Sequence, residues 1–222
     1  MVESYQGWGA LFYPKNYIKA LRKWATEHNV IVIFDEIQAG FGRTGRWWGY
    51  QMTDTTPDIA VMGKPMGAGL PVSGAVARKE IAEEFHQKSH YFNTTAGTPL
   101  QAAVGKTVIE IIEEEGLIEN ANKTGGYMKK ELLNLKDRYP SMGDIRGHGL
   151  FLGVDMIKNL DDLEPDKESA VAVVEKMKEK GFLISYDGQF ENVLKIRPPL
   201  VFKTSHAELF LTGLEETLKE VS

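Results

Sequence analysis

The stretch VIVIFDEIQAGFGRTG, residues Val30–Gly45, decides the fold. Its first five residues are aliphatic or aromatic, which is typical of a strand buried on both faces of a parallel sheet. Such a strand would carry Asp35 at its carboxyl end. Because open α/β sheets bind their ligands beside the carboxyl ends of their strands, we expect the chemistry of the protein at this edge.

A second apolar run, DIAVMG at Asp58–Gly63, predicts a neighbouring buried strand. It leads directly into Lys64, and a turn rich in glycine and proline follows. A lysine shielded from water loses its proton more readily, and its neutral amine is a nucleophile. A lysine that simply extends from the loop into solvent fits the position equally well. With both interpretations open, Asp35 and Lys64 form the first candidate site.

The segments around these strands predict an α/β protein. Apolar residues recur on one helical face over residues 14–29, so a helix precedes the first strand, as in a βαβ unit. Further helices are expected at 79–87, 99–115 and 117–139. After Pro140 the pattern changes to strand–strand–helix–strand–strand–helix, which predicts a small α+β domain. We therefore expect a partial large domain with a mainly parallel sheet at 1–137 and a small α+β domain at 138–222.

Composition excludes several classes of function. The net charge of −5 argues against non-specific nucleic-acid binding, and the absence of cysteine excludes disulfides and thiolate zinc sites. No apolar run approaches the roughly 18 residues of a membrane span. The first residues lack the basic and then apolar pattern of a secretory signal. We expect a cytoplasmic protein with no nucleic-acid or membrane partner.

Two nucleotide patterns overlap the first strand. Residues 40–45, GFGRTG, match the dinucleotide fingerprint GxGxxG, but they begin several residues after the strand and open no convincing helix. VIVIFDE also resembles the magnesium-binding strand of a nucleotide triphosphatase, which would use Asp35 and Glu36. That alternative needs a GxxxxGK[ST] loop, which this sequence lacks. Asp35 and Glu36 point to opposite faces of a strand, so we do not expect them to form an acid–base pair.

Histidines and threonines supply two weaker candidates. His86 and His90 are four residues apart in a polar segment without a third ligand, so no metal site is predicted. Thr94 and Thr95 lie in a loop just before a helix. Their hydroxyls suit a phosphate group at a helix start, or an ordinary helix cap.

A basic pair stands in NVLKIRPPL. Because side chains alternate along a strand, Lys195 and Arg197 should share one face, and Leu194 and Ile196 the other. The pair could hold a carboxylate or sulfonate. Its alternative is the charged surface of an edge strand.

Five segments, in this order, resemble the class III aminotransferases, which are pyridoxal-phosphate enzymes of fold type I. They are FDEIQAGFGRTGRWWGY, TPDIAVMGKPMGAGLPVSGAV, NTTAGTPLQAA, RGHGLFLGVD and VLKIRPPLVF. The resemblance implies pyridoxal 5′-phosphate as cofactor. It also implies transamination, in which an amino acid or ω-amino compound gives its nitrogen to a keto acid.

The resemblance assigns four cofactor residues. Asp35 matches the aspartate on the pyridine nitrogen, and Gln38 matches the residue near the ring hydroxyl. Lys64 matches the lysine that forms the Schiff base and shuttles a proton, so Lys64 and Asp35 are the expected catalytic residues. Thr94 matches the threonine that reaches the cofactor phosphate across a homodimer interface.

The substrate segments depart from the family pattern. Several ω-aminotransferases carry a QGE motif that pairs with an arginine in a segment like IRxxPPL. Here Trp8 replaces the acid, Lys195 occupies the basic position, and Arg197 follows two residues later. We expect Trp8, Lys195 and Arg197 to lie at the substrate site, with Trp8 lining a pocket for a small donor.

Family members are longer, and the resemblance begins midway along them. We therefore expect this chain to be their C-terminal half, active as a homodimer or with a partner that supplies the N-terminal half. The alternative within the same fold is a non-catalytic or split-enzyme assembly subunit.

Overall fold

The computed structural model describes residues 1–221, which form two compact units that we describe separately. Unit 1 holds the central strands of the candidate site, and unit 2 holds most of the C-terminal half. Unit 1 comprises residues 1–5, 13–41 and 46–116, and unit 2 comprises residues 6–12, 42–45 and those from Leu117 onward. The predicted domain boundary between residues 137 and 138 stays a prediction.

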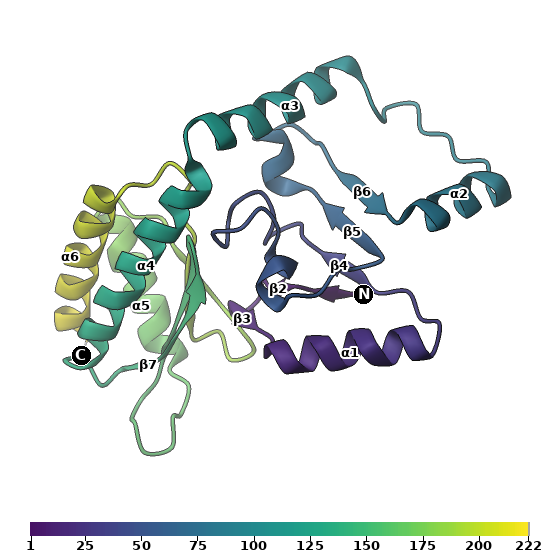
Figure 1. Ribbon diagram of the computed structural model, residues 1–222. Coiled ribbons are helices and arrows are strands. Elements are labelled where there is room, and N and C mark those ends of the chain that lie inside the picture. The colour runs from purple at the N-terminus through teal and green to yellow at the C-terminus, as the bar shows by residue number, and fades with distance from the viewer. Residues whose placement is uncertain (222) are drawn as a thin grey trace. The chain divides into compact units, whose positions relative to one another are not determined.

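The sheet of unit 1 has four strands in the order β1-β4-β5-β6, and Figure 1 labels β4, β5 and β6. Its first three strands are parallel and the last is antiparallel. The strands are β1 (Val2–Glu3), β4 (Ile33–Asp35), β5 (Ile59–Met62) and β6 (Gly74–Ala77). The two strands expected from their apolar runs are thus present and adjacent. β1 has only two residues, which are too few to show a strand pattern in the sequence.

α1 (Lys15–Glu27) covers one face of this sheet, where Ile18 and Ala25 pack against Val32 and Phe34. β4 begins later than expected, and the side chains of Val30 and Ile31 are 44% and 50% exposed. The expectation of a strand buried on both faces is therefore wrong for its first residues. The Val30 N–H donates to the Ala25 carbonyl at 2.8 Å, so this part of the run completes the end of α1.

Asp58 ties α1 to the sheet. Its carboxylate accepts the Val32 N–H at 2.7 Å and the Arg22 guanidinium at 2.5 Å, and it also binds Arg78 at 3.2 Å. Burial acts to raise the pKa of Asp58, but the hydrogen bonds from Val32, Arg22 and Arg78 outweigh it and hold that pKa below its usual range. One charged group thus fixes where both strands begin.

The remaining elements of unit 1 follow the expected order. Thr98 caps α3 by accepting the Gln101 N–H at 3.4 Å, and Pro99 occupies the first helical position. Gln101 also donates to the Pro71 carbonyl at 3.1 Å, which links α3 to the turn after β5. The elements are η1 (Gly49–Thr53), η2 (Lys64–Gly67), α2 (Lys79–Lys88) and α3 (Pro99–Glu114).

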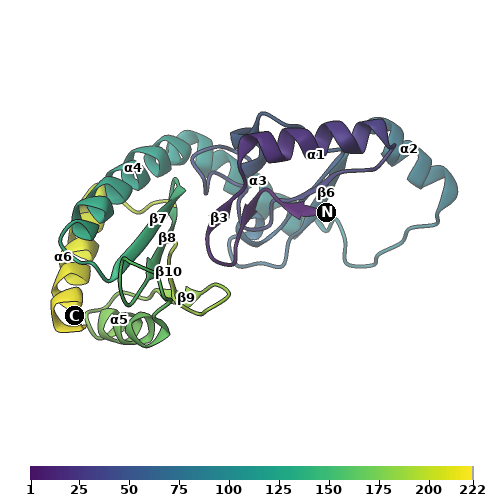
Figure 2. The ribbon, with the colours of Figure 1, turned by 90° about the horizontal axis from the view of Figure 1, so that it is seen from below.

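Unit 2 is an antiparallel sheet with helices on one face, as Figure 2 shows. Its strands lie in the order β7-β8-β10-β9, and a large apolar core joins them to the helices. The strands are β7 (Met142–His148), β8 (Phe151–Met156), β9 (Ser185–Asp187) and β10 (Val193–Ile196). The helices are α4 (Leu117–Lys136), α5 (Lys167–Glu179) and α6 (Thr204–Val221).

The expected strand and helix order after Pro140 is present. Two short strands, β2 (Tyr5–Gln6) and β3 (Leu11–Phe12), pair with each other. Across residues 1–221 the helices are too short or too polar to span a membrane.

Candidate active site

The carboxyl edge of the unit 1 sheet gathers the first candidates. β4 and β5 are parallel, and Asp35 is in register with Val61. Asp35 therefore ends β4 one residue before β5 ends. Met62 ends β5, and Gly63 and Lys64 follow. The fold therefore brings a carboxylate and an amine to the same edge, as parallel pairing predicts.

Asp35 is half-buried and locally oriented. Its Oδ1 accepts the Ile37 N–H at 2.9 Å, which fixes the carboxylate at the start of the turn. Gln38 lies in the same turn and is also half-buried. The turn thus presents an acid and an amide from neighbouring positions at the sheet edge.

Glu36 has a different environment. Its carboxylate is fully buried and accepts the backbone N–H groups of Gly49 at 2.6 Å and Tyr50 at 2.9 Å. Burial raises the pKa of Glu36, although these hydrogen bonds oppose the shift. With both oxygens engaged, Glu36 holds the 49–50 segment and is not placed to ligate a metal beside Asp35. Among residues 1–221, no group of three His, Cys, Asp or Glu side chains could hold a metal ion.

Lys64 begins η2 in a strained conformation. Its φ of 33° is positive, which costs a residue with a side chain, and such strain clusters at functional sites. α3 packs against η2, where a Cβ at Gly105 of α3 would make an ordinary van der Waals contact with the Met66 carbonyl oxygen at 3.9 Å. The Lys64 side chain is exposed in this chain, as in the interpretation of a lysine that extends from the loop into solvent.

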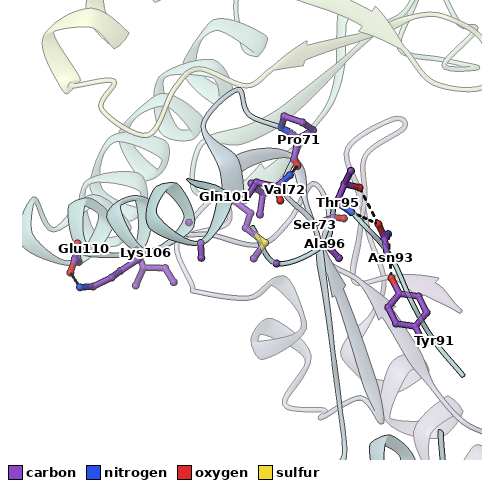
Figure 3. Close-up of a pocket in the computed structure, with 15 residues that line it drawn as sticks. Pro71, Val72, Ser73, Tyr91, Asn93, Thr95, Ala96, Gln101, Lys106 and Glu110 are labelled. Atoms are coloured by element: carbon purple, nitrogen blue, oxygen red, sulfur yellow. Dashed lines mark hydrogen bonds and ion pairs between the residues drawn. The ribbon is translucent and has the colours of Figure 1, made fainter. Parts of the chain in front are cut away.

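Thr94 lies in the exposed loop between α2 and α3. Because Thr98 caps α3, the cap interpretation does not apply to Thr94. The Asn93 carboxamide oxygen accepts both the N–H and the hydroxyl of Thr95 at 3.0 Å, which shapes the loop beside Thr94. Figure 3 shows this arrangement together with Tyr91.

A hollow of about 750 Å³ lies between this loop and α3. Figure 3 shows Gln101, Lys106 and Glu110 along its helical wall, with Pro71 and Val72 from the turn after η2. Asp35 and Lys64 do not line it. The hollow therefore adjoins the segment that follows Lys64 without containing the two candidate catalytic side chains.

The GFGRTG loop is a packing element. A Cβ at Gly45 would lie 2.0 Å from the Asn122 carboxamide oxygen, and Asn122 donates to the Gly45 carbonyl at 2.7 Å. Arg43 donates to the carbonyls of Leu150 and Pro198. Burial and then the Arg197 charge lower the pKa of Arg43 to about 10. These contacts match the interpretation of the motif as a loop that only coincidentally resembles a nucleotide site.

The substrate candidates all lie in unit 2. Lys195 Nζ donates to the Gly7 carbonyl and pairs with Asp187 Oδ2 at 2.6 Å. Arg197 is exposed, and its guanidinium lies 5.5 Å from the centre of the Phe151 ring. Lys195 approaches the same ring at 5.8 Å, so both cations lie on one face, as the alternation predicts. Trp8 lines a separate cavity of about 480 Å³.

Sequence reasoning missed two residues beside Trp8. Arg146 donates to the Gly9 carbonyl at 2.8 Å, and Asp187 accepts the Gly9 N–H at 3.0 Å. Arg146 alternates with Asp144 in GDIRGH, a pattern that is also typical of a solvated strand face. Nothing in the local sequence connects either residue to a segment more than a hundred positions away.

The model of the family described as aminotransferase class-III matches residues 1–218. An alanine–glyoxylate aminotransferase 2-like protein of Drosophila melanogaster is 38% identical over 225 residues, covering 100% of this chain and 46% of that protein. An ethanolamine-phosphate phospho-lyase homolog of Caenorhabditis elegans is also 38% identical, over 95% of this chain and 46% of its own length.

Among solved structures, a phospholyase from Arthrobacter in complex with phosphoethanolamine superimposes with a TM-score of 0.92 at 40% identity. The match covers 95% of this chain and 50% of that one. The predicted α/β fold is thereby confirmed as that of these enzymes. The chain spans about half the length of the relatives it matches.

Proposed function

Because the chain belongs to the class-III aminotransferase family, we propose that it carries the catalytic lysine half of an enzyme that transfers an amino group from an amino donor to a keto acid. Members of this family depend on pyridoxal 5′-phosphate. The observation that carries the proposal is the placement of Asp35 and Lys64 at the carboxyl edge of two adjacent parallel strands.

The donor set at this edge fits the cofactor. A ring nitrogen needs a fixed anion, and the Asp35 carboxylate is held by the Ile37 N–H. An aldehyde needs an amine, and Lys64 follows the neighbouring strand on a strained turn. Gln38 offers an amide in the turn after Asp35, near the proposed position of the ring hydroxyl. Thr94 is proposed to contact the phosphate of a second copy's cofactor.

When bound, the cofactor supplies an electron sink for the bond broken at the substrate α-carbon. Asp35 would hold a proton on the ring nitrogen, which its negative charge favours. Lys64 would anchor the cofactor covalently. Once the substrate amine displaces it, the free Lys64 amine would take the proton from the α-carbon.

The first test is reduction of the purified protein with borohydride after addition of pyridoxal 5′-phosphate. Peptide mass spectrometry should find the reduced adduct on Lys64, and Lys64→Ala should lose it. The exposed Lys79 provides the control, since Lys79→Ala should keep the adduct on Lys64. A folded protein without an adduct on Lys64 would contradict cofactor binding by this chain.

Amino transfer is then assayed with amino donors and keto acids. Transfer that is lost in Lys64→Ala supports the enzyme. An adduct without transfer by any donor would instead favour a non-catalytic or split-enzyme assembly subunit, which needs a partner for the N-terminal half.

A second candidate reaction is elimination of phosphate from a phosphorylated amine. It is favoured by the likeness to two phospho-lyases, one of them solved with phosphoethanolamine. An assay with phosphoethanolamine as the only amine, with and without an added keto acid, separates the two reactions. Release of inorganic phosphate indicates elimination, whereas amino transfer to an added keto acid without phosphate release indicates transamination.

A further inference from the structure

One face of the unit 2 sheet carries two cationic side chains on either side of a glycine. Arg146 of β7 and Lys195 of β10 are both in register with Gly153 of the strand between them. The opposite face holds apolar side chains such as Leu152 and Leu194, which pack in the core. The two cations therefore flank a site on the sheet that has no side chain.

Two acids lie one step further along the same face. Asp155 and Asp187 are both in register with Val193. Arg146 pairs with Asp155 at 2.7 Å, and Lys195 pairs with Asp187 at 2.6 Å. The four side chains are only 12–27% exposed, so these pairs are not ordinary surface pairs.

Residues 6–12 cover this face, and the charged side chains bind the backbone of that segment. Lys195 donates to the Gly7 carbonyl, Asp187 accepts the Gly9 N–H at 3.0 Å, and Arg146 donates to the Gly9 carbonyl at 2.8 Å. A Cβ on Gly153 would lie 2.8 Å from the Ala10 Cβ. The missing side chain of Gly153 is therefore what allows the segment to approach the sheet.

The backbone on both sides of Trp8 is fixed by these contacts. Gly9 has a φ of 80° and Ala10 a φ of 51°, and a left-handed alanine is strained. Trp8 itself is 58% exposed and lines the cavity of about 480 Å³. The network thus holds a strained segment that presents one large aromatic side chain to a cavity.

We propose that Arg146, Asp187 and Lys195 are positioning residues that hold Trp8 as a wall of the substrate pocket. Lys195 acts through the Gly7 backbone and does not bind a substrate carboxylate. The inference rests on the proposed function, and the substrate role of Trp8 is the one that the family resemblance implies; Asp35 and Lys64 do not line the cavity beside Trp8.

The position of Trp8 can be measured without cofactor or substrate. Protein labelled with 5-fluorotryptophan should give four fluorine resonances, one for each tryptophan, and Trp8→Phe assigns one of them. Lys195→Met should change the chemical shift of the Trp8 resonance and leave the other three in place. An unmoved Trp8 resonance would overturn the proposal.

Matched variants separate positioning from general damage. Lys167→Met removes an exposed ion pair with Glu191 in the same unit, and it should leave all four resonances unchanged. Lys195→Arg keeps the charge and should restore the Trp8 resonance. If Lys195→Met does not fold, Asp187→Asn serves instead and should also change the Trp8 resonance. This variant loses the ion pair that holds Lys195, while its amide oxygen can still accept the Gly9 N–H.

Kinetics provide the second readout. A displaced pocket wall should lower kcat/KM about 10- to 100-fold, equally for donors with and without a distal carboxylate. A loss confined to carboxylate donors, with Trp8 unmoved, would show direct substrate binding by Lys195 and overturn the proposal. If no amino donor reacts, the proposed function fails, while the fluorine resonances still decide whether the network positions Trp8.

Discussion

Adjacent acids at the end of β4 illustrate how single side chains acquire different tasks. One oxygen of Asp35 accepts a local N–H. Both oxygens of Glu36 accept backbone N–H groups from the first two residues of η1. Because strand side chains alternate, one acid faces the candidate site and the other faces the interior. The alternative triphosphatase interpretation needed both acids at one site.

We expect Glu36→Gln to destabilise the fold by about 1–3 kcal/mol, because the amide nitrogen cannot accept an N–H and leaves a buried donor unpaired. The pKa of Glu36 is raised on folding, so the wild-type protein loses stability as pH rises through that pKa. Glutamine does not titrate. The difference in the free energy of unfolding between wild type and Glu36→Gln should therefore be largest at low pH and should become smaller as pH rises.

Urea unfolding at a series of pH values measures this difference. Glu84→Gln is the control, since Glu84 is exposed and pairs with Lys88 on α2. It should change stability little. If wild type and Glu36→Gln differ in the free energy of unfolding by the same amount at every pH, the raised pKa of Glu36 is contradicted.

Most of the residue assignments at the unit 1 edge could be proposed from sequence, because the strand ends and the motif order are local signals. Lys195 shows the limit. It was expected at the substrate site because of its position in the segment that leads into Pro-Pro. In the structure its amine binds the Gly7 carbonyl, which is distant in the sequence, and Asp187 on the neighbouring strand. No local pattern predicts which backbone carbonyl a strand cation will meet.

At the scale of elements, close packing of α4 depends on one glycine of an adjacent pair. A Cβ at Gly125 would lie 1.9 Å from the Gly149 carbonyl oxygen, whereas a Cβ at Gly126 meets nothing within 4 Å. Sequence periodicity predicts the helix but does not distinguish the two glycines. The contact, in turn, sets how α4 approaches the turn between β7 and β8.

Gly125→Ala should therefore destabilise the protein by about 1–3 kcal/mol, because rigid backbone must move to admit the methyl group. Gly126→Ala should be neutral or stabilise it by up to about 1 kcal/mol, through helix propensity alone. Chemical denaturation of both variants tests the contrast. Equal effects of the two substitutions would refute the close approach.

The same scale explains why β4 was predicted too long. Val30 and Ile31 are as apolar as the residues that follow, but the Val30 N–H completes α1 and Asp58 binds the Val32 N–H. The helix before the strand and the acid before the next strand determine where β4 begins. An apolar run alone does not contain that information.

At the scale of the molecule, the two units differ in their cores. The large core of unit 2 joins every one of its helices α4, α5 and α6 to the sheet, whereas the cluster beneath α1 in unit 1 is small. Burial of apolar surface sets local stability.

Hydrogen exchange should therefore be slower for the backbone amides of β8 and β10 than for those of β4 and β5. All four strands are central strands of their sheets, which makes the two pairs a fair comparison. Mass spectrometry of peptic fragments gives the measurement. Equal or reversed protection would mean that the size of the core does not control local opening here.

Gly153 offers a route to redesigning this protein from a distance. It does not line the cavity beside Trp8, yet a methyl group there would push against Ala10, two residues from that tryptophan. Under the proposed role of Trp8, directed evolution for new amino donors would be expected to recover substitutions at this buried glycine. Libraries restricted to cavity-lining side chains would omit this position, although a methyl group there meets the segment that carries Trp8.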